Sequence, residues 1–385
     1  MKKILVIGLI VVLGLVIGLR LVLPQAQSPG QTDISGLITT PDPGFARATG
    51  PIPLSFPADD GPHPAYQTEW WYYTGNLQAA GGQHFGFELT FFRRALQSPG
   101  SAAQRTSDLG SDQIYMAHLA LTDVQDNQFS YFERFSRGSA GLAGALGSPA
   151  YSVWLEDWQV SQMGPGQYRL TASSGQISLD LSLKNGKERV LQGDQGFSQK
   201  GPGSGNASIY TSQTRLETSG TIQSGGQQFQ VNGLSWMDHE FSTSALSAGQ
   251  VGWDWFALQL NDGSELTVYS IRRADGTQDP FARGSLVGPD GAVTGLKKAD
   301  FVISSSQDWT SPASGAHYPA GWTIKVPSEG IDLTITPYIN DQELRVSFTY
   351  WEGAVQVEGK KNGNSVAGSG YVELTGYARS LAGQF

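Results

Sequence analysis

The residues best suited to chemistry are concentrated in one short part of the chain. Residues 236–242 read Trp-Met-Asp-His-Glu-Phe-Ser, and residues 252–256 follow as Gly-Trp-Asp-Trp-Phe. The chain holds only five His and ten Trp in 385 residues, so this combination stands out. A carboxylate beside an imidazole can move protons near neutral pH, as general acid–base catalysis requires. The candidate catalytic residues are therefore Asp238, His239, Glu240 and Asp254.

A second stretch upstream has a similar composition. Residues 63–73 read His-Pro-Ala-Tyr-Gln-Thr-Glu-Trp-Trp-Tyr-Tyr. A Glu enclosed by aromatic rings has a raised pKa and can donate a proton, and the rings suit an apolar ligand or a positive charge. The candidate ligand-binding residues are His63, Glu69, Trp70, Trp71, Trp236, Trp253, Trp255 and Tyr269.

Both stretches also have a structural interpretation. If the first is a strand, Asp238 and Glu240 face one side and His239 the other, whereas in a loop at a barrel mouth all three converge. The carboxylates can also pair with nearby Arg residues while the Trp side chains fill a barrel core. His63 lies between two Pro in a turn-rich segment, where a solvent-facing position is the simpler expectation. His118, within an alternating segment, is expected to be a hydrogen-bonded residue of a barrel wall.

The two stretches are expected to meet. Charged or titratable residues such as Glu69, Asp238 and His239 need partners if they lie in an apolar wall. Each stretch lies near the start of one half of the chain, so the simplest arrangement brings them together at the junction between the halves. We expect His239 to lie within about 15 Å, the width of a cleft, of Glu69 or Trp70.

Several kinds of site are not expected. The chain has no Cys, which excludes Cys nucleophiles, thiolate zinc sites and iron–sulfur clusters. No His-x-His, His-x-x-x-His or EF-hand spacing occurs, so no metal site is expected. No nucleophile elbow, P-loop or dinucleotide fingerprint occurs, so no cofactor is expected. A net charge of −9 does not favour nucleic acid, and no coiled coil or recognition motif indicates a protein partner.

The rest of the chain is typical of antiparallel β-structure. Its 49 Gly and its charged fraction of 15% suit many strands joined by tight turns. Segments such as 84–92 and 115–123 alternate apolar and polar side chains, as half-buried strands do. Residues 71–94 and 253–273 each run as aromatic strand, glycine turn, strand and double Arg. We therefore expect an all-β protein of two similar antiparallel β-barrels packed side by side.

The N-terminus predicts export. Lys2 and Lys3 precede an uncharged apolar run, Ile4–Leu19, as in a signal peptide or an anchor. An uncleaved signal anchor is favoured over a cleaved signal, because the run is long for a cleaved peptide and no clear cleavage site follows. The positive-inside rule then places the body outside the cytoplasmic membrane, with the membrane as a partner. The expected organisation is a signal anchor or signal peptide at 1–24, a flexible linker at 25–56, and barrels at 57–230 and 231–385.

Four motifs together resemble a known family. Besides residues 63–75, 236–242 and 252–256, residues 370–377 read Gly-Tyr-Val-Glu-Leu-Thr-Gly-Tyr. In this order they resemble the carotenoid 1,2-hydratase/AttH-like family, often labelled predicted secreted hydrolases with lipocalin-like domains. The resemblance runs from about residue 56 to residue 377. It implies two lipocalin-like β-barrels and a hydrophobic, isoprenoid-like ligand.

The resemblance also implies a chemistry. Hydratases of this family add water across a terminal double bond of an acyclic carotenoid without a redox cofactor, which requires an acid and a base. In that role Asp238, Glu240 or Asp254 is the expected proton donor, and His239 orients the donor or activates water. The chain has Glu240-Phe241 where those enzymes tend to continue Asn-Trp, and no acidic residue follows Tyr269, so it lies nearer the uncharacterised secreted branch. A secreted hydrolase and a non-catalytic lipid or pigment carrier remain alternatives.

Overall fold

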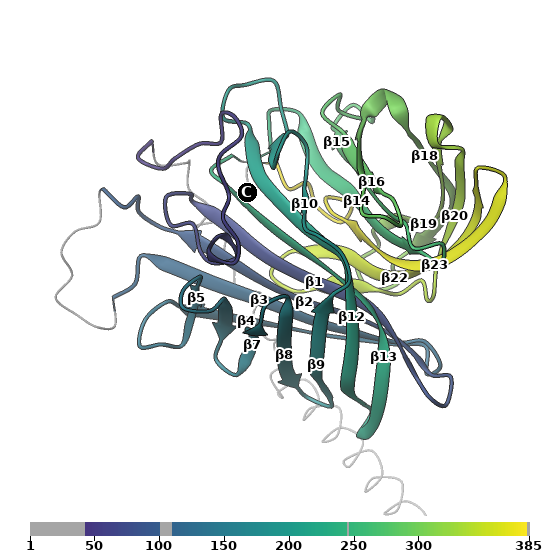
Figure 1. Ribbon diagram of the computed structural model, residues 1–385, viewed down its shortest axis with the longest axis horizontal. Coiled ribbons are helices and arrows are strands. Elements are labelled where there is room, and N and C mark those ends of the chain that lie inside the picture. The colour runs from purple at the N-terminus through teal and green to yellow at the C-terminus, as the bar shows by residue number, and fades with distance from the viewer. Residues whose placement is uncertain (1–42, 101–109, 245, 383–385) are drawn as a thin grey trace, which may run out of the picture. The chain divides into compact units, whose positions relative to one another are not determined.

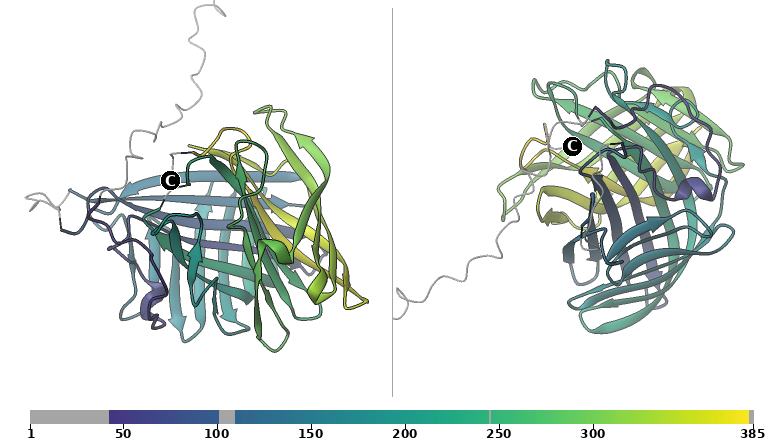
Figure 2. Two further views of the ribbon diagram at one scale, coloured as in Figure 1. Left: turned by 90° about the horizontal axis from the view of Figure 1, so that it is seen from above. Right: turned by 90° about the vertical axis from the view of Figure 1, so that its left-hand side faces the viewer.

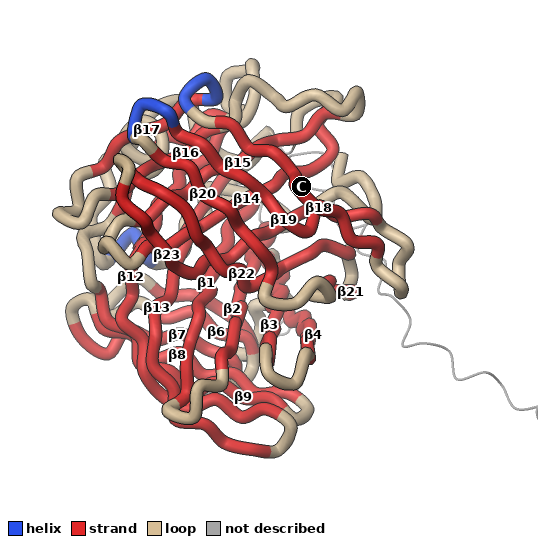
Figure 3. The backbone as a smooth tube through the Cα atoms, turned by 90° about the vertical axis from the view of Figure 1, so that its right-hand side faces the viewer, coloured by secondary structure: helices blue, strands red, loops and turns tan. Residues whose placement is uncertain are grey.

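The described part of the chain is built almost wholly from β-strands. A computed structural model describes residues 43–100, 110–244 and 246–382. These ranges contain 23 strands and three short 3₁₀-helices (Figure 3). The 3₁₀-helices are η2 (Ala58–Asp60), η3 (Lys298–Asp300) and η4 (Pro327–Glu329). Within the described ranges, no helix has the length and apolar character needed to span a bilayer.

The first sheet is antiparallel and runs from Thr68 to Ser242. Its thirteen strands follow the order β4-β3-β2-β1-β13-β12-β9-β8-β7-β6-β5, with β10 and β11 paired on β12. The late strand β13 returns beside β1, and the sheet curls into a barrel-like form (Figure 1). The strands are β1 (Thr68–Ala79), β2 (His84–Ala95), β3 (Gln113–Asp123), β4 (Gln128–Arg137), β5 (Ala143–Leu146), β6 (Ser152–Leu155), β7 (Trp158–Gly164), β8 (Gln167–Ser174), β9 (Ile177–Asn185), β10 (Val190–Leu191), β11 (Phe197–Gln199), β12 (Ala207–Ser224) and β13 (Gln227–Ser242).

The second sheet is also antiparallel and curled. Its ten strands follow the order β17-β16-β15-β14-β23-β22-β20-β19-β18, with β21 paired on β22. Figure 2 shows both sheets from two further sides. The strands are β14 (Gln250–Leu260), β15 (Glu265–Arg273), β16 (Arg283–Val287), β17 (Val293–Lys297), β18 (Val302–Thr310), β19 (His317–Val326), β20 (Ile331–Pro337), β21 (Glu343–Arg345), β22 (Thr349–Lys361) and β23 (Asn364–Leu374).

Each curled sheet is filled by its own side chains. In the first sheet, alternate residues of β1 such as Trp71 and Tyr73 point inward and join a buried cluster with Met237 of β13. In the second, Trp322 and Trp351 belong to a separate buried cluster. Burying one such large apolar side chain contributes about 1.5–3 kcal/mol. Neither interior is therefore the natural place for a ligand.

The outer faces of the two sheets meet each other. Alternation along β1 and β13 turns Tyr72 and Trp236 away from the first core, and they pack with Trp255 and Tyr269 of the second sheet. At the crossing of β2 and β22 the approach is close enough to require glycine. A Cβ on Gly86 would lie 2.4 Å from the Cβ of Ala354, where no side chain fits.

The expected all-β architecture of two barrel-like antiparallel sheets is confirmed, whereas the expected boundaries need changes. The boundary between residues 230 and 231 falls inside β13, which pairs only within the first sheet. The chain passes to the second sheet between Ser242 and Gln250. The expected signal anchor or signal peptide at 1–24 lies outside the described residues.

The segment expected as a flexible linker, 25–56, is described from residue 43 onward. Phe45 and Ala48 are buried there, and Ala48 packs with Phe241 in a small apolar cluster. The backbone N–H of Ala46 also donates to the carbonyl of Ala65, at 2.9 Å. This part of the segment is therefore packed against the first barrel and is not a free tether.

Candidate functional site

A pocket lies between the two sheets, on the faces that the two cores leave free. It comprises about 1210 Å³ of space between the side chains, a volume that includes the open solvent at its mouth. Strands β1, β2, β12 and β13 of the first sheet form one wall, and β14, β15, β22 and β23 of the second sheet contribute the other. The charged or ionisable acidic and basic residues that line it are Glu88, Lys200, Asp238, Glu240 and Glu373.

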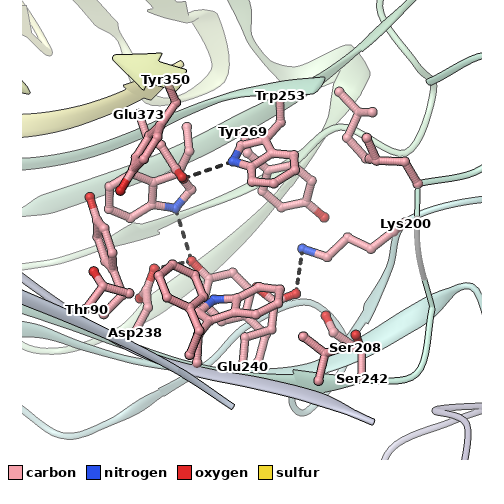
Figure 4. A pocket seen from close by; sticks show the side chains of 18 of the residues that line it. Thr90, Lys200, Ser208, Asp238, Glu240, Ser242, Trp253, Tyr269, Tyr350 and Glu373 are labelled. Atoms are coloured by element: carbon pink, nitrogen blue, oxygen red, sulfur yellow. Dashed lines mark hydrogen bonds and ion pairs between the residues drawn. The ribbon is translucent and has the colours of Figure 1, made fainter. Parts of the chain in front are cut away.

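Six of the residues predicted from the sequence line this pocket. The first sheet supplies Asp238 and Glu240, which share the outer face of β13, and Trp70, which lies beside them on β1. The second sheet supplies Trp253, Trp255 and Tyr269. Aromatic faces from both sheets therefore surround a few ionisable groups, as expected for a site that holds an apolar molecule (Figure 4).

Asp238 is held by three hydrogen-bond donors. Its Oδ1 accepts from Ser212 Oγ at 2.6 Å and from Trp236 Nε1 at 2.7 Å, and its Oδ2 accepts from Tyr210 OH at 2.5 Å. Burial raises the pKa of Asp238 to about 7, although the three donors favour the ionised form and oppose the shift. Since all three neighbours donate to it, Asp238 is fixed as an acceptor.

Glu373 has a different environment across the pocket (Figure 4). It projects from β23, and its Oε2 accepts a hydrogen bond from Trp253 Nε1 at 2.9 Å. Burial raises the pKa of Glu373 to about 8, and the nearby carboxyl groups of Glu88, Asp238 and Glu240 add to the rise. At neutral pH Glu373 is therefore a carboxylic acid that carries a proton into an aromatic pocket.

Glu88 and Glu352 continue this acidic group between the sheets. Burial raises the pKa of Glu88, and it raises the pKa of Glu352 well above its ordinary value. Tyr72 donates its phenol proton to Glu352. Three neighbouring carboxyl groups thus share an environment that favours the protonated form.

Lys200 brings a positive charge to the pocket from the loop between β11 and β12. Its Nζ lies 3.1 Å from Glu240 Oε1 and 4.2 Å from the centre of the Tyr269 ring (Figure 4). Burial acts to lower the pKa of Lys200, but Glu240 and Tyr269 outweigh it and the pKa is raised. Lys200 and Glu240 therefore form an ion pair at one side of the pocket.

The predicted approach of the two sequence stretches is confirmed at atomic distance. His239 Nε2 lies 2.8 Å from Glu69 Oε1, and His63 Nδ1 lies 2.9 Å from the same oxygen. The cause is strand pairing, because β1 and β13 are neighbours and Trp71 stands opposite His239. The contact therefore lies within the first barrel and not at the junction between the halves, where it was expected.

His239 is separated from the two carboxylates that flank it in sequence. Because β13 is extended, Asp238 and Glu240 face the pocket while His239 faces inward and stacks on Trp71, with ring centres 5.1 Å apart. The structure thus corrects the expectation that His239 assists Asp238 or Glu240 in one site. Neither His63 nor Glu69 lines the pocket either.

The inward cluster of His63, Glu69 and His239 could be considered as a metal site. One ligand-capable atom from each lies within 4.8 Å of the others, the one such group in the described ranges. However, Glu69 Oε1 already contacts both imidazoles, and Oε2 accepts from Arg93 Nε and from the His63 backbone N–H, each at 2.9 Å. Arg93 supplies the positive charge that a buried carboxylate needs. Both oxygens of Glu69 are therefore used in hydrogen bonds, although the buried His239 Nδ1 and Arg93 Nη1 have no hydrogen-bond partner among the described residues.

The remaining predicted residues lie outside the pocket. Asp254 faces away from it, where Arg272 Nε lies 2.9 Å from Oδ1 and Tyr377 OH donates at 3.1 Å. Trp71 belongs to the first core, and Trp236 does not line the pocket but contacts its wall through the hydrogen bond to Asp238 and edge-on packing with Trp255. Asp254 is therefore no longer a candidate proton donor for a ligand in this pocket.

The pocket residues that sequence reasoning missed include Glu88, Lys200, Tyr350 and Glu373. Glu88 and Glu373 stand within stretches of alternating or motif sequence, so an acidic residue on an otherwise apolar strand was an available signal. Lys200 and Tyr350 carried no such signal, because only long-range strand pairing brings them to the pocket.

Comparisons with known proteins agree with this architecture. A family model described as AttH-like matches residues 47–377. A solved protein described as an AttH, from Nitrosomonas europaea, is 33% identical, with a TM-score of 0.76 over 86% of this chain and 100% of that chain. Kievitone hydratase from Nectria haematococca is 14% identical, with a TM-score of 0.65 over 88% and 98% of the two chains. CghA is 14% identical, with a TM-score of 0.52 over 89% and 95%. The last two show the fold alone, and no curated protein matches the chain.

Proposed function

The chain belongs to the AttH-like family, and from this premise we propose that it binds a hydrophobic, isoprenoid-like molecule between its two sheets and adds water across a double bond. The observation that carries the proposal is Glu373. A carboxyl group with a pKa of about 8 in an aromatic pocket keeps its proton at neutral pH until a weak base such as an alkene is placed against it.

The proton donor differs from the one expected from the sequence. Asp238 accepts three hydrogen bonds, so its oxygens are occupied and favour the ionised form. Glu373 accepts a side-chain hydrogen bond from the indole N–H of Trp253, whereas Asp238 accepts three. Glu373 is therefore the more fully protonated group at neutral pH and the better candidate proton donor, and Asp238 is a positioning residue that fixes Tyr210 in the pocket wall and Trp236 behind it.

The pocket wall suits the intermediate of such a reaction. Protonating one alkene carbon leaves a positive charge on the other, and aromatic faces stabilise cations by about 0.5–2 kcal/mol each. Trp253 and Trp255 line the pocket on the side of Glu373, and Tyr72 meets Trp255 edge-on with ring centres 5.2 Å apart. Apolar walls also limit the water that would otherwise compete for the proton.

An assay with an acyclic carotenoid tests the proposal. Purified full-length protein is incubated with lycopene, and the product is expected to gain the mass of one water. Glu373→Gln should lower the rate by about 100-fold or more, because it removes the acid and keeps the shape. Glu343→Gln is the matched control, since Glu343 is a buried carboxyl group of the second sheet that does not line the pocket. Lycopene that binds the wild-type protein but is recovered unchanged would indicate a carrier.

We also propose that the folded body lies outside the cytoplasmic membrane, anchored by the N-terminal segment. Support comes from Lys2 and Lys3 followed by the apolar run Ile4–Leu19. Alkaline phosphatase joined to the C-terminus should be active in cells and remain with the membrane fraction. Charged residues introduced into Ile4–Leu19 should abolish the phosphatase activity. Phosphatase activity that is unchanged by those substitutions would contradict the proposal.

A further inference from the structure

A chain of hydrogen bonds leads from the pocket wall toward the surface of the first barrel. Tyr350 OH, which lines the pocket, lies 2.6 Å from His118 Nδ1. The other ring nitrogen, His118 Nε2, lies 3.0 Å from Glu133 Oε1. The three residues come from β22, β3 and β4, so only the meeting of the two sheets assembles them. A carboxylate, an imidazole and a hydroxyl in this order form the arrangement that activates a hydroxyl group as a proton acceptor.

The direction of the hydrogen bonds follows from the partners of Glu133. The backbone N–H and the hydroxyl of Ser347 both donate to Glu133. Burial acts to raise the pKa of Glu133, but the interactions with His118 and the Ser347 donors outweigh it, so the pKa is lowered and Glu133 is ionised. An ionised carboxylate accepts, so His118 Nε2 carries the proton that it donates. In the neutral imidazole His118 Nδ1 is then a lone pair, which accepts from Tyr350 O–H.

The competing acceptor of Tyr350 is farther away. Tyr350 OH also lies 3.3 Å from Glu88 Oε1, but that oxygen already accepts from Thr90 Oγ1 at 2.7 Å. The 2.6 Å contact with His118 Nδ1 is the shorter of the two, and His118 Nδ1 has no second hydrogen-bond donor competing for it in the described residues. The phenol proton is therefore directed away from the pocket.

Burial isolates the His118 imidazole from solvent, but it does not isolate Glu133 at the outer end of the hydrogen-bond chain. The His118 side chain is fully buried, with the rings of Phe92 and Phe348 centred 5.3 and 5.4 Å from it. The Glu133 side chain keeps 16% of its surface exposed. A charge that appears on His118 is thus balanced by a carboxylate that solvent can reach.

We propose that Tyr350, His118 and Glu133 act as the base of the hydration, which rests on the proposed function. After Glu373 gives its proton to one alkene carbon, the oxygen of a water molecule bonds to the other. That water passes one proton to Tyr350 oxygen as the phenol proton moves to His118 Nδ1, and Glu133 stabilises the imidazolium. The addition consumes one water and leaves Glu373 ionised and His118 protonated. One proton returning from His118 to Glu373, through solvent after product release, restores the starting state.

Hydration requires both an acid and a base, and this proposal supplies the base. The acid Glu373 and the base Tyr350 lie on neighbouring strands of the second sheet, β23 and β22, and the first sheet supplies His118 and Glu133, which act through Tyr350. Tyr350 is the residue that touches the reacting water, whereas His118 and Glu133 act through it as positioning and proton-holding residues.

The protonation state of His118 can be read without any substrate. Full-length protein is labelled with ¹⁵N-histidine, and the His118 signals are assigned by their absence in His118→Gln. We expect Nε2 to carry a proton and Nδ1 to be an unprotonated nitrogen that accepts a hydrogen bond. In Tyr350→Phe, the ¹⁵N chemical shift of Nδ1 should move toward that of an unprotonated nitrogen without a hydrogen bond. Tyr318→Phe is the matched control, because it removes a buried phenol that donates to Glu343 at 3.0 Å outside the pocket. A proton on Nδ1 at neutral pH would overturn the proposal.

The lycopene assay then tests the role in catalysis. Tyr350→Phe and His118→Gln should each lower kcat by about 100-fold or more, with lycopene affinity unchanged, because a general base acts on the rate and not on binding. Glu133→Gln keeps an acceptor for Nε2–H and should lower kcat while the His118 tautomer is retained. Full hydration by Tyr350→Phe overturns the relay and leaves the proposed function intact. No hydration by the wild-type protein overturns the proposed function itself.

Discussion

His239 Nε2 and Glu69 Oε1 lie 2.8 Å apart although 170 residues separate them in the chain. The bond joins β13 to β1, and Arg93 of β2 binds the same carboxylate. Burial acts to raise the pKa of Glu69, but Arg93 and the two imidazoles outweigh it and hold the pKa far below its ordinary value. One ionised side chain thus links three strands of the first barrel.

Removing this carboxylate should destabilise the protein strongly. Glu69→Gln leaves the fully buried Arg93 without its counter-charge, which costs about 3–5 kcal/mol in the free energy of unfolding. Urea denaturation measures the change. Asp332→Asn is the control, because it breaks an exposed pair with Lys325 and should cost less than about 1 kcal/mol. Equal losses for the two variants would contradict the assigned role of the cluster.

Glu69 also makes a contribution to the free energy of unfolding that depends on pH. Because the folded pKa of Glu69 lies below the unfolded value of 4.5, its contribution is fully present above that value and is lost as the pH falls below it. Glu69→Gln lacks this contribution, so its deficit in unfolding free energy relative to the wild-type protein should shrink progressively as the pH falls from about 5 to about 3, below the unfolded carboxyl pKa of 4.5. Urea midpoints measured across that range test the sign.

Glu373 should affect stability with the opposite sign. Its folded pKa of about 8 lies above the unfolded value of 4.5, so its contribution is present at low pH and is lost as the pH rises through about 8. Glu373→Gln has no proton to lose and should gain stability relative to the wild-type protein over this range, by at most about 1.4 kcal/mol per pH unit. Thermal unfolding at several pH values measures it, and parallel profiles for the two proteins would contradict a protonated Glu373.

Ligand affinity should depend on the pocket wall and not on the inward cluster. Trp253→Ala removes apolar contact area and the donor to Glu373, and it should weaken lycopene binding by about 10-fold or more. His239→Ala should leave affinity unchanged in the molecules that remain folded, because His239 does not line the pocket. Quenching of Trp fluorescence measures both, with Trp154→Phe as a control outside the pocket. Equal weakening by both variants would indicate that the cluster belongs to the binding site.

Zinc should not stabilise the protein through His63, Glu69 and His239. Both oxygens of Glu69 already accept hydrogen bonds, and Arg93 opposes a second cation. Thermal unfolding with and without zinc, after treatment with a chelator, is expected to give the same Tm. A rise in Tm that disappears in His63→Ala would show that a metal replaces the hydrogen bonds.

Local pattern predicted several of the strands, such as those at 84–92 and 115–123, but it left open whether residues 238–240 form a strand or a loop in which all three side chains converge. The alternation of Asp238, His239 and Glu240 already placed the imidazole opposite the carboxylates in any extended chain. The pairing of β1 with β13 was beyond local pattern, and so the expected contact of His239 with Glu69 was placed at the wrong boundary. Pattern also could not rank the carboxyl groups, because Asp238 and Glu373 differ only in the donors that the fold brings to them.

Lys200, His118 and Tyr350 illustrate a second limit. Lys200 reaches the pocket from a loop, and nothing in its neighbouring sequence indicates an ion pair with Glu240. His118 was expected to be a hydrogen-bonded residue of a barrel wall, and it is one, but its partner Tyr350 lies 232 residues away on the other sheet. A functional role that depends on how the two sheets pack cannot be predicted from the sequence of either half alone.

The contact between Gly86 and Ala354 acts as a spacer between the two walls. Neither residue lines the pocket, yet the distance between their backbones fixes how closely β2 can approach β22. Small changes at this crossing would widen or narrow the gap without altering any group that touches a ligand. Relatives with the same acid and the same aromatic walls could in this way accept a flat polyene or a bulkier ring system. Ligand thickness would then be selected at a point remote from the chemistry.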